Sequence, residues 1–222
     1  STPTCSNARI SAAAVEAAPR QSRPRRARLF ATIVAMENAL RRAAPSCPSA
    51  PDPTLALARA LIACPSVTPD DAGCQALIAA RLAALGFRCE TLAAGGVTNL
   101  WARRGSGRPL VCFAGHTDVV PSGPVERWDS PPFVASERDG RLYGRGACDM
   151  KGGVAAMVFA TEVLRGLDVP LRGDLIVNTV TDEESTGAGA LASVAHGVAA
   201  DGGIVPEPTA LTAWLGTLGS LM

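Results

Sequence analysis

The sequence predicts an α/β fold, and three features carry that prediction. Two segments with a helical spacing of apolar residues come first, at 53–64 and 70–85. Two runs with the length and composition of strands follow them, at 87–92 and 97–103. A third run, at 110–113, is wholly apolar, which is typical of a buried strand. Helices and strands in this order form a layered structure in which helices cover a sheet.

The two N-terminal helices have their own boundary signals. Pro65 follows the end of the first helix. Asp70 and Asp71 are expected to cap the start of the second helix, and Gly86 to end it. The side chains expected to face the core from these helices are Leu55, Leu57, Leu61, Ile62, Leu77, Ile78, Leu82 and Leu85.

The stretch LVCFAGHTD at 110–118 joins the buried strand to polar residues. Ala114-Gly115 is expected to turn the backbone, so that His116 and Asp118 lie at the carboxyl end of the strand. That edge of an α/β sheet is where ligands bind. Taken alone, the triplet is better explained by a hydrogen-bonded structural histidine, so residues further along the chain are needed to favour a site.

A glycine-rich stretch, GRGACDMKGG at 144–153, follows a short hairpin that ends at Leu142-Tyr143. It passes into an apolar helix at 154–164, so Asp149 is expected at a junction between loop and helix. The glycine spacing does not match a dinucleotide fingerprint, and the pattern G-x-x-x-x-G-K of a phosphate loop is absent. A helix-capping aspartate is the alternative explanation of Asp149.

Acidic residues also follow the last two expected strands. The strand at 175–180 leads into Thr181-Asp182-Glu183-Glu184, where three neighbouring carboxylates repel one another. A positive charge nearby is the simplest remedy. After a helix at 187–199, a short strand at 202–205 leads to Glu207.

One histidine and several carboxylates are therefore expected at strand ends and loop mouths. They are His116, Asp118, Asp149, Glu183, Glu184 and Glu207. Such a set suits zinc, manganese or cobalt, and bridging carboxylates suit a pair of ions roughly 3.5–4 Å apart. Side chains alternate at a strand end, so one of Glu183 and Glu184 can bind metal while the other serves as a base.

Composition argues against several other classes of protein. Residues 1–50 hold eight Arg and two Glu, whereas the remainder holds 13 basic and 18 acidic residues, which argues against a nucleic-acid-binding face. No apolar run approaches the length of a membrane span. The seven cysteines never form Cys-x-x-Cys, so we expect buried reduced thiols rather than disulfides or a cysteine zinc site.

Residues 1–52, rich in Ser, Pro, Ala and Arg, are expected to be disordered, with one helical patch at 29–43, ahead of an ordered domain at 53–222. Two interpretations stay open. The segment resembles an organelle transit peptide, or it is an upstream extension without function and the natural start is Met36. We expect a cytoplasmic protein in the second case and an organellar one in the first.

Five motifs in this order resemble the M20 metallopeptidase family, in its branch of succinyl-diaminopimelate desuccinylases and acetylornithine deacetylases. They are GHTDVVP at 115–121, WDSPPF at 128–133, DGRLYGRGACDMKG at 139–152, TDEES at 181–185 and EPT at 207–209. The resemblance covers the domain at 53–222. It implies a zinc-peptidase-like mixed sheet flanked by helices and two Zn²⁺ ions, with Co²⁺ or Mn²⁺ as substitutes.

The resemblance also implies roles for the site residues. The implied metal ligands are His116 and Glu207 at one zinc, Glu184 at the second, and Asp149 between the two. Asp118 would hydrogen-bond the histidine and orient it. Glu183 would be the general base, which deprotonates the water that attacks the amide carbonyl of an N-acyl amino acid and then protonates the leaving amine.

Two departures from the family pattern stand out. The family has a further site histidine near its C-terminus and an inserted dimerising lid domain; neither is found before Met222, and His196 is expected on a helix that cannot replace them. Pro206 stands where the family usually has Gly, which stiffens the loop that carries Glu207. The chain is therefore expected to be an N-terminal portion of the catalytic domain, without the dimerisation domain and weakly active or inactive alone.

Two functional hypotheses follow. The first is a metal-dependent deacylase acting on a small N-acyl amino acid, with no nucleic-acid or membrane partner. The stretch at 89–105 favours N-succinyl-diaminopimelate as substrate, whereas 173–209 is closer to acetylornithine deacetylases and other peptidases of the branch. The second hypothesis is a truncated, non-catalytic metal-binding remnant.

Overall fold

A computed structural model of the protein describes residues 52–167 and 173–210. The disorder and the helical patch expected before residue 52 lie outside these residues, and the domain boundary stays a prediction. No helix in the described ranges is long and apolar enough to cross a membrane. The cysteines in the same ranges are free thiols, as expected: Cys64, Cys74, Cys89, Cys112 and Cys148. The expectation that they are buried holds for Cys74 and Cys112 and is wrong for the exposed Cys148.

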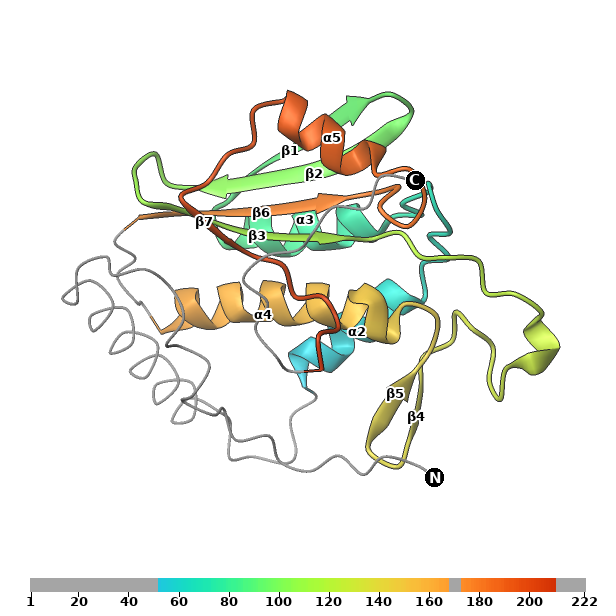
Figure 1. Ribbon diagram of the computed structural model, residues 1–222. Coiled ribbons are helices and arrows are strands. Elements are labelled where there is room, and N and C mark those ends of the chain that lie inside the picture. The colour runs from blue at the N-terminus through green and yellow to red at the C-terminus, as the bar shows by residue number, and fades with distance from the viewer. Residues whose placement is uncertain (1–51, 168–172, 211–222) are drawn as a thin grey trace, which may run out of the picture. The chain divides into compact units, whose positions relative to one another are not determined.

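A five-stranded mixed sheet in the order β1-β2-β6-β3-β7 forms the centre of the described chain (Figure 1). Its strands are β1 (Arg88–Ala94), β2 (Val97–Arg104), β3 (Leu110–His116), β6 (Asp174–Val180) and β7 (Gly202–Ile204). The β1–β2 and β2–β6 pairs are antiparallel, while β3 lies parallel to both β6 and β7. The mixed sheet that the sequence predicts is confirmed. A separate hairpin joins β4 (Ser136–Arg138) to β5 (Arg141–Tyr143), as expected.

Helices cover the two faces of the sheet unequally (Figure 1). They are α2 (Pro53–Ile62), α3 (Cys74–Ala84), α4 (Gly152–Gly166) and α5 (Ala188–Ala195). One large core cluster joins α2, α3 and α4 to the sheet, with Leu61, Ile78 and Val158 wholly buried in it. The opposite face is covered by α5, which buries Gly189 and Ser193. Burial of apolar side chains on the first face supplies most of the stabilisation that holds the strand ends in place.

The second helix begins later than the sequence predicts. Asp71 does cap it, since its carboxylate accepts the N–H groups of Gly73 (3.0 Å) and Gln75 (3.0 Å). Gly73 has φ of 93°, so the helix starts only at Cys74, and Cys74 and Gln75 enter the buried face. The expectation that Leu77 faces the core is wrong, because this side chain is 38% exposed.

The turn expected at Ala114-Gly115 is also wrong. Strand β3 continues through His116, because Gly115 and His116 pair in register with Thr179 and Val180 of β6. Gly115 is needed for packing instead, since a Cβ atom there would lie 2.9 Å from Cε of Met150. His116 is thus held by the sheet itself, which is a more rigid support than a loop.

Helix α5 is shorter than the range 187–199 that the sequence predicts. It ends at Ala195, and the exposed His196 is its C-terminal cap. Gly197 follows with φ of 87°, a left-handed conformation that ends a helix. His196 therefore does not belong to the candidate site described in the next subsection.

Candidate functional site

Three side chains from three separate segments meet at the carboxyl end of the parallel strands. His116 ends β3, Asp149 lies in the turn Ala147–Lys151 that precedes α4, and Glu184 lies in the turn after β6. Each can offer a ligand atom such that all three atoms lie within 4.8 Å of one another. One imidazole nitrogen and two carboxylate oxygens at this spacing can hold a single divalent cation.

The orientation of the His116 ring is set by main-chain contacts. The side chain is 2% exposed, and its Nδ1 lies 2.9 Å from the carbonyl oxygen of Asp118. We infer that Nδ1 is the protonated ring nitrogen and donates a hydrogen bond to this carbonyl. Nε2 then keeps its lone pair, as a metal ligand must.

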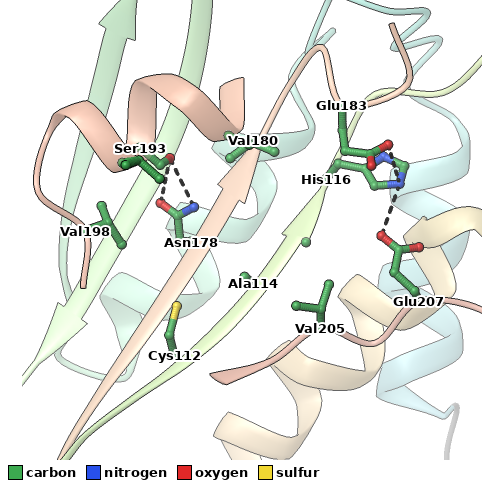
Figure 2. A pocket seen from close by; sticks show the side chains of 13 residues that line it. Cys112, Ala114, His116, Asn178, Val180, Glu183, Ser193, Val198, Val205 and Glu207 are labelled. Atoms are coloured by element: carbon green, nitrogen blue, oxygen red, sulfur yellow. Dashed lines mark hydrogen bonds and ion pairs between the residues drawn. The ribbon is translucent and has the colours of Figure 1, made fainter. Parts of the chain in front are cut away.

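Carboxylates surround the free nitrogen of this ring. Nε2 of His116 lies 3.1 Å from Oδ1 of Asp149, 3.7 Å from Oε1 of Glu207 and 3.8 Å from Oε2 of Glu183. Figure 2 shows Glu183 and Glu207 reaching the ring from different segments. All the residues predicted for the site therefore lie close together, and the Asp118 carboxylate has further partners of its own.

The Asp118 carboxylate is fully buried beside the histidine. Its Oδ1 is 3.6 Å from Nδ1 of His116, so the closer partner of the ring is the Asp118 carbonyl. The two carboxylate oxygens instead accept the backbone N–H groups of Glu183 (3.3 Å) and Glu184 (3.2 Å). Asp118 thus touches the histidine through its main chain and the two glutamates through its side chain.

Asp149 makes no capping hydrogen bond at the start of α4, so the alternative explanation of this residue does not describe the structure. Its side chain is 52% exposed, and the peptide bond to Met150 is cis. The neighbouring Lys151 is fully buried and points away from the acids, with Nζ donating to the carbonyls of Leu61 (2.8 Å) and Cys64 (2.7 Å). The turn that carries Asp149 is therefore tied to the end of α2.

The three consecutive acids after β6 divide into two kinds. Glu183 and Glu184 lie in a turn, so the strand-end geometry expected for them is wrong. Asp182 is buried, with φ of 60°, and its carboxylate accepts hydrogen bonds from the Thr186 hydroxyl and the Ala188 N–H. The bond from Thr186 lowers the pKa of Asp182 despite burial. This structural role was missed from the sequence; an Asp ahead of Thr and a helix start is the signal that indicates it.

Burial and the neighbouring carboxylates raise the pKa values of two other acids of the site, Glu207 and Glu184. Burial raises the pKa of Glu207 to about 7, His116 opposes the rise, and Asp149 and Glu183 add to it. Burial and then Asp149 raise the pKa of Glu184. Burial alone would lower the pKa of His116, but the Asp118 carbonyl and the charges of Glu183 and Glu207 raise it.

Within the described ranges, no lysine or arginine forms an ion pair with these carboxylates. A divalent cation would relieve the repulsion among them and would find nitrogen and oxygen donors already grouped. The residues present therefore fit a bound metal ion.

A pocket of about 290 Å³ opens beside these side chains, between α5, β3 and β6. Figure 2 shows Val180, Val198 and Val205 around it, with His116 at one end. Toward the other end, the Ser193 hydroxyl and the Asn178 side chain hydrogen-bond to each other. A small molecule in this pocket would reach the histidine and the acids directly.

Comparison with protein families gives a match over part of the chain. Residues 112–217 match the model of peptidase family M20/M25/M40. Among curated proteins, the chain is 51% identical over 180 residues to a succinyl-diaminopimelate desuccinylase of Azoarcus sp. (strain BH72), which covers 78% of this chain and 46% of that protein. It is 55% identical over 160 residues to the enzyme of the same name from Bordetella petrii, with 70% and 42% covered. The chain spans less than half the length of these relatives.

Solved structures agree on the fold. Human carnosine dipeptidase 1 matches with a TM-score of 0.59 and 27% identity, over 68% of this chain and 38% of that chain. An M20 family metallo-carboxypeptidase from Sulfolobus solfataricus matches with a TM-score of 0.62 and 22% identity, over 70% and 37%. The second likeness concerns the fold alone. In both cases the described sheet and its helices correspond to a minority of the larger structure.

Proposed function

The chain belongs to peptidase family M20/M25/M40, and on that premise we propose that it serves the metal-dependent hydrolysis of the amide bond of an N-acyl amino acid. The observation that carries this proposal is the meeting of ligand atoms from His116, Asp149 and Glu184. The preferred substrate is N-succinyl-diaminopimelate rather than N-acetylornithine. Two relatives above 50% identity bear the name succinyl-diaminopimelate desuccinylase, which supports that choice.

The family implies a divalent metal ion, and we propose two zinc ions. His116 and Glu207 would hold one, Glu184 the other, and Asp149 would lie between them. The donor set supports this assignment, since imidazole and carboxylates are ligands that zinc accepts. When bound, the metal polarises the amide carbonyl and makes water a stronger nucleophile at neutral pH.

Glu183 is the group proposed to move the proton. Its side chain is 47% exposed, so it can face both the reacting water and the solvent, and its Oε2 lies 3.8 Å from Nε2 of His116. The carboxylate takes a proton from the attacking water and returns it to the nitrogen of the leaving amine. Glu184, which lies in the group with His116 and Asp149, is the neighbour that binds metal.

The test of this function is the release of succinate from N-succinyl-diaminopimelate by the zinc-loaded chain, with Glu183→Gln as the matched control. We expect release that depends on Glu183 and exceeds the release of acetate from N-acetylornithine. A low rate suffices, since the criterion is the difference between the two proteins and the two substrates. Equal release by wild type and Glu183→Gln, or faster release of acetate from N-acetylornithine than of succinate, would contradict the proposal.

A further inference from the structure

We propose that the Asp118 carboxylate, which lies beside the His116 ring, is also a positioning group for the acid turn, residues 182–187. The inference rests on the proposed function in one respect, because it says how the base and a metal ligand of that function are held. It makes Asp118 the residue that sets the distance between the end of β3 and the turn after β6.

The Asp118 carboxylate contacts the acid turn directly. The N–H groups of two consecutive residues, Glu183 and Glu184, approach its two oxygens separately, at 3.3 Å from Oδ1 and 3.2 Å from Oδ2. Asp118 is fully buried, so on folding its carboxylate loses its hydrogen bonds to water and gains these two N–H donors. Hydrogen bonds to a buried charged acceptor are stronger than neutral ones. These bonds fix the backbone at the start of the acid turn.

The His116 ring also has a main-chain partner. Nδ1 of His116 contacts the Asp118 carbonyl at 2.9 Å, whereas the carboxylate lies at 3.6 Å, beyond hydrogen-bonding distance. The main chain around that carbonyl is held independently. The Thr117 N–H donates to the Val180 carbonyl (2.9 Å), and the Ser66 hydroxyl donates to the Thr117 carbonyl (2.7 Å). Loss of the Asp118 carboxylate would therefore leave the ring its main-chain contact.

The far end of the acid turn has a separate support. Asp182 accepts hydrogen bonds from the Thr186 hydroxyl and the Ala188 N–H, and its carbonyl accepts the Gly187 N–H at 2.7 Å. Removing the Asp118 carboxylate would free only the stretch that carries Glu183 and Glu184. We therefore expect a local effect on these two residues, without loss of the helix that follows.

The experiment is hydrogen exchange of backbone amides by NMR on the metal-free 1–222 chain, with Asp118→Asn as the variant. The new amide group has only one acceptor oxygen, so one of the two N–H groups loses its partner. We expect exchange at Glu183 or Glu184 to become about tenfold faster or more. The ¹⁵N signals of the His116 ring should keep the pattern of a ring protonated at Nδ1, and zinc affinity should fall about 10–100-fold.

Asp71→Asn is the matched control. Asp71 carries the same carboxylate close to the same segment, since it accepts a hydrogen bond from the Thr117 hydroxyl at 2.9 Å, but within the described chain it forms no hydrogen bond with the acid turn. This variant should leave exchange at Glu183 and Glu184 as in wild type. Faster exchange in both variants would show a general loosening and would overturn the proposal.

Two further results would also overturn it. One is wild-type exchange at both glutamates in Asp118→Asn together with shifted ring signals, which would show that Asp118 acts through the histidine. If Asp118→Asn does not fold, the wild-type protein decides, because amides of Glu183 and Glu184 that exchange at the rate of an unstructured peptide would exclude the hydrogen bonds. The exchange rates and the ring signals need neither metal nor turnover, so failure of the proposed function leaves them interpretable.

Discussion

A single added methyl group at Gly153 tests how Glu207 is held. Gly153 lies in the first turn of α4, and a Cβ atom there would lie 2.3 Å from the carbonyl oxygen of Pro206. This neighbour is backbone, so no side-chain rotation can relieve the contact. The helix or the segment at 206–207 must move by about 1 Å to restore a normal contact distance. Glu207 is the next residue, and its Oε1 lies 3.7 Å from Nε2 of His116.

The magnitude follows from two opposed effects. Replacing Gly by Ala inside a helix stabilises it by up to about 1 kcal/mol. Forcing extra volume into a packed contact costs about 1–3 kcal/mol. For Gly153→Ala we expect a net loss of about 1–2 kcal/mol in the free energy of unfolding, because the contact is with backbone. Displacement of Glu207 should also lower zinc affinity about tenfold or more, as changes around metal ligands do.

The assay combines urea unfolding with zinc titration, and Gly166→Ala is the control. Gly166 lies in the same helix, but a Cβ atom there would meet nothing within 4 Å. This variant should be as stable as wild type or slightly more stable, with unchanged zinc affinity. If Gly153→Ala behaves like Gly166→Ala in both measurements, the packing of the 206–207 segment on α4, and with it the position of Glu207, is refuted.

Three other predictions test the site and its support. Glu184→Gln should lose bound zinc in metal analysis, whereas Glu183→Gln should keep it while turnover falls by about 10²–10⁴; the opposite pattern of metal loss would exchange the two roles. Because folding raises the pKa of Glu207 from 4.5 to about 7 and raises the pKa of His116, the metal-free folded state binds protons more tightly than the unfolded state, and its stability should fall as pH rises from about 5 to above 7. Thermal unfolding measures this, and a melting temperature that rises over the same range would contradict it. Lys151→Met leaves two buried carbonyls without their donor and should cost about 1–3 kcal/mol in urea unfolding, so a variant as stable as wild type would show that these bonds contribute nothing.

The strands and helices could be predicted largely from local pattern, whereas their exact limits depend on contacts between distant residues. Gly115 is typical of a turn, yet pairing with β6 keeps it in the strand. Gln75 looks like a surface residue, yet it is 8% exposed because its Nε2 donates to the Thr98 carbonyl at 2.7 Å. Hydropathy cannot show either effect, since both depend on a partner that lies far away in the sequence.

The chemistry of the site was visible in the sequence, but its supports were not. Carboxylates placed after strands pointed to a metal centre, and the structure brings His116, Asp149 and Glu184 together. The acids at 182–184 look equivalent in the sequence, and only the fold separates Asp182, which holds the turn, from its two neighbours. Lys151 likewise lies next to the site in sequence but donates to carbonyls at and just after the end of α2. Such roles depend on the direction of a side chain, which spacing along the chain does not determine.

Calorimetric titration of the metal-free chain with zinc tests most directly the claim that His116, Asp149 and Glu184 form a metal site. The chain has two histidines, so His196→Ala, which alters the exposed one, is the matched control for His116→Ala. We predict that wild type and His196→Ala bind one zinc ion at micromolar concentrations and a second more weakly, and that His116→Ala loses the first. No binding by the folded wild-type chain, or unchanged binding in His116→Ala, would contradict the account.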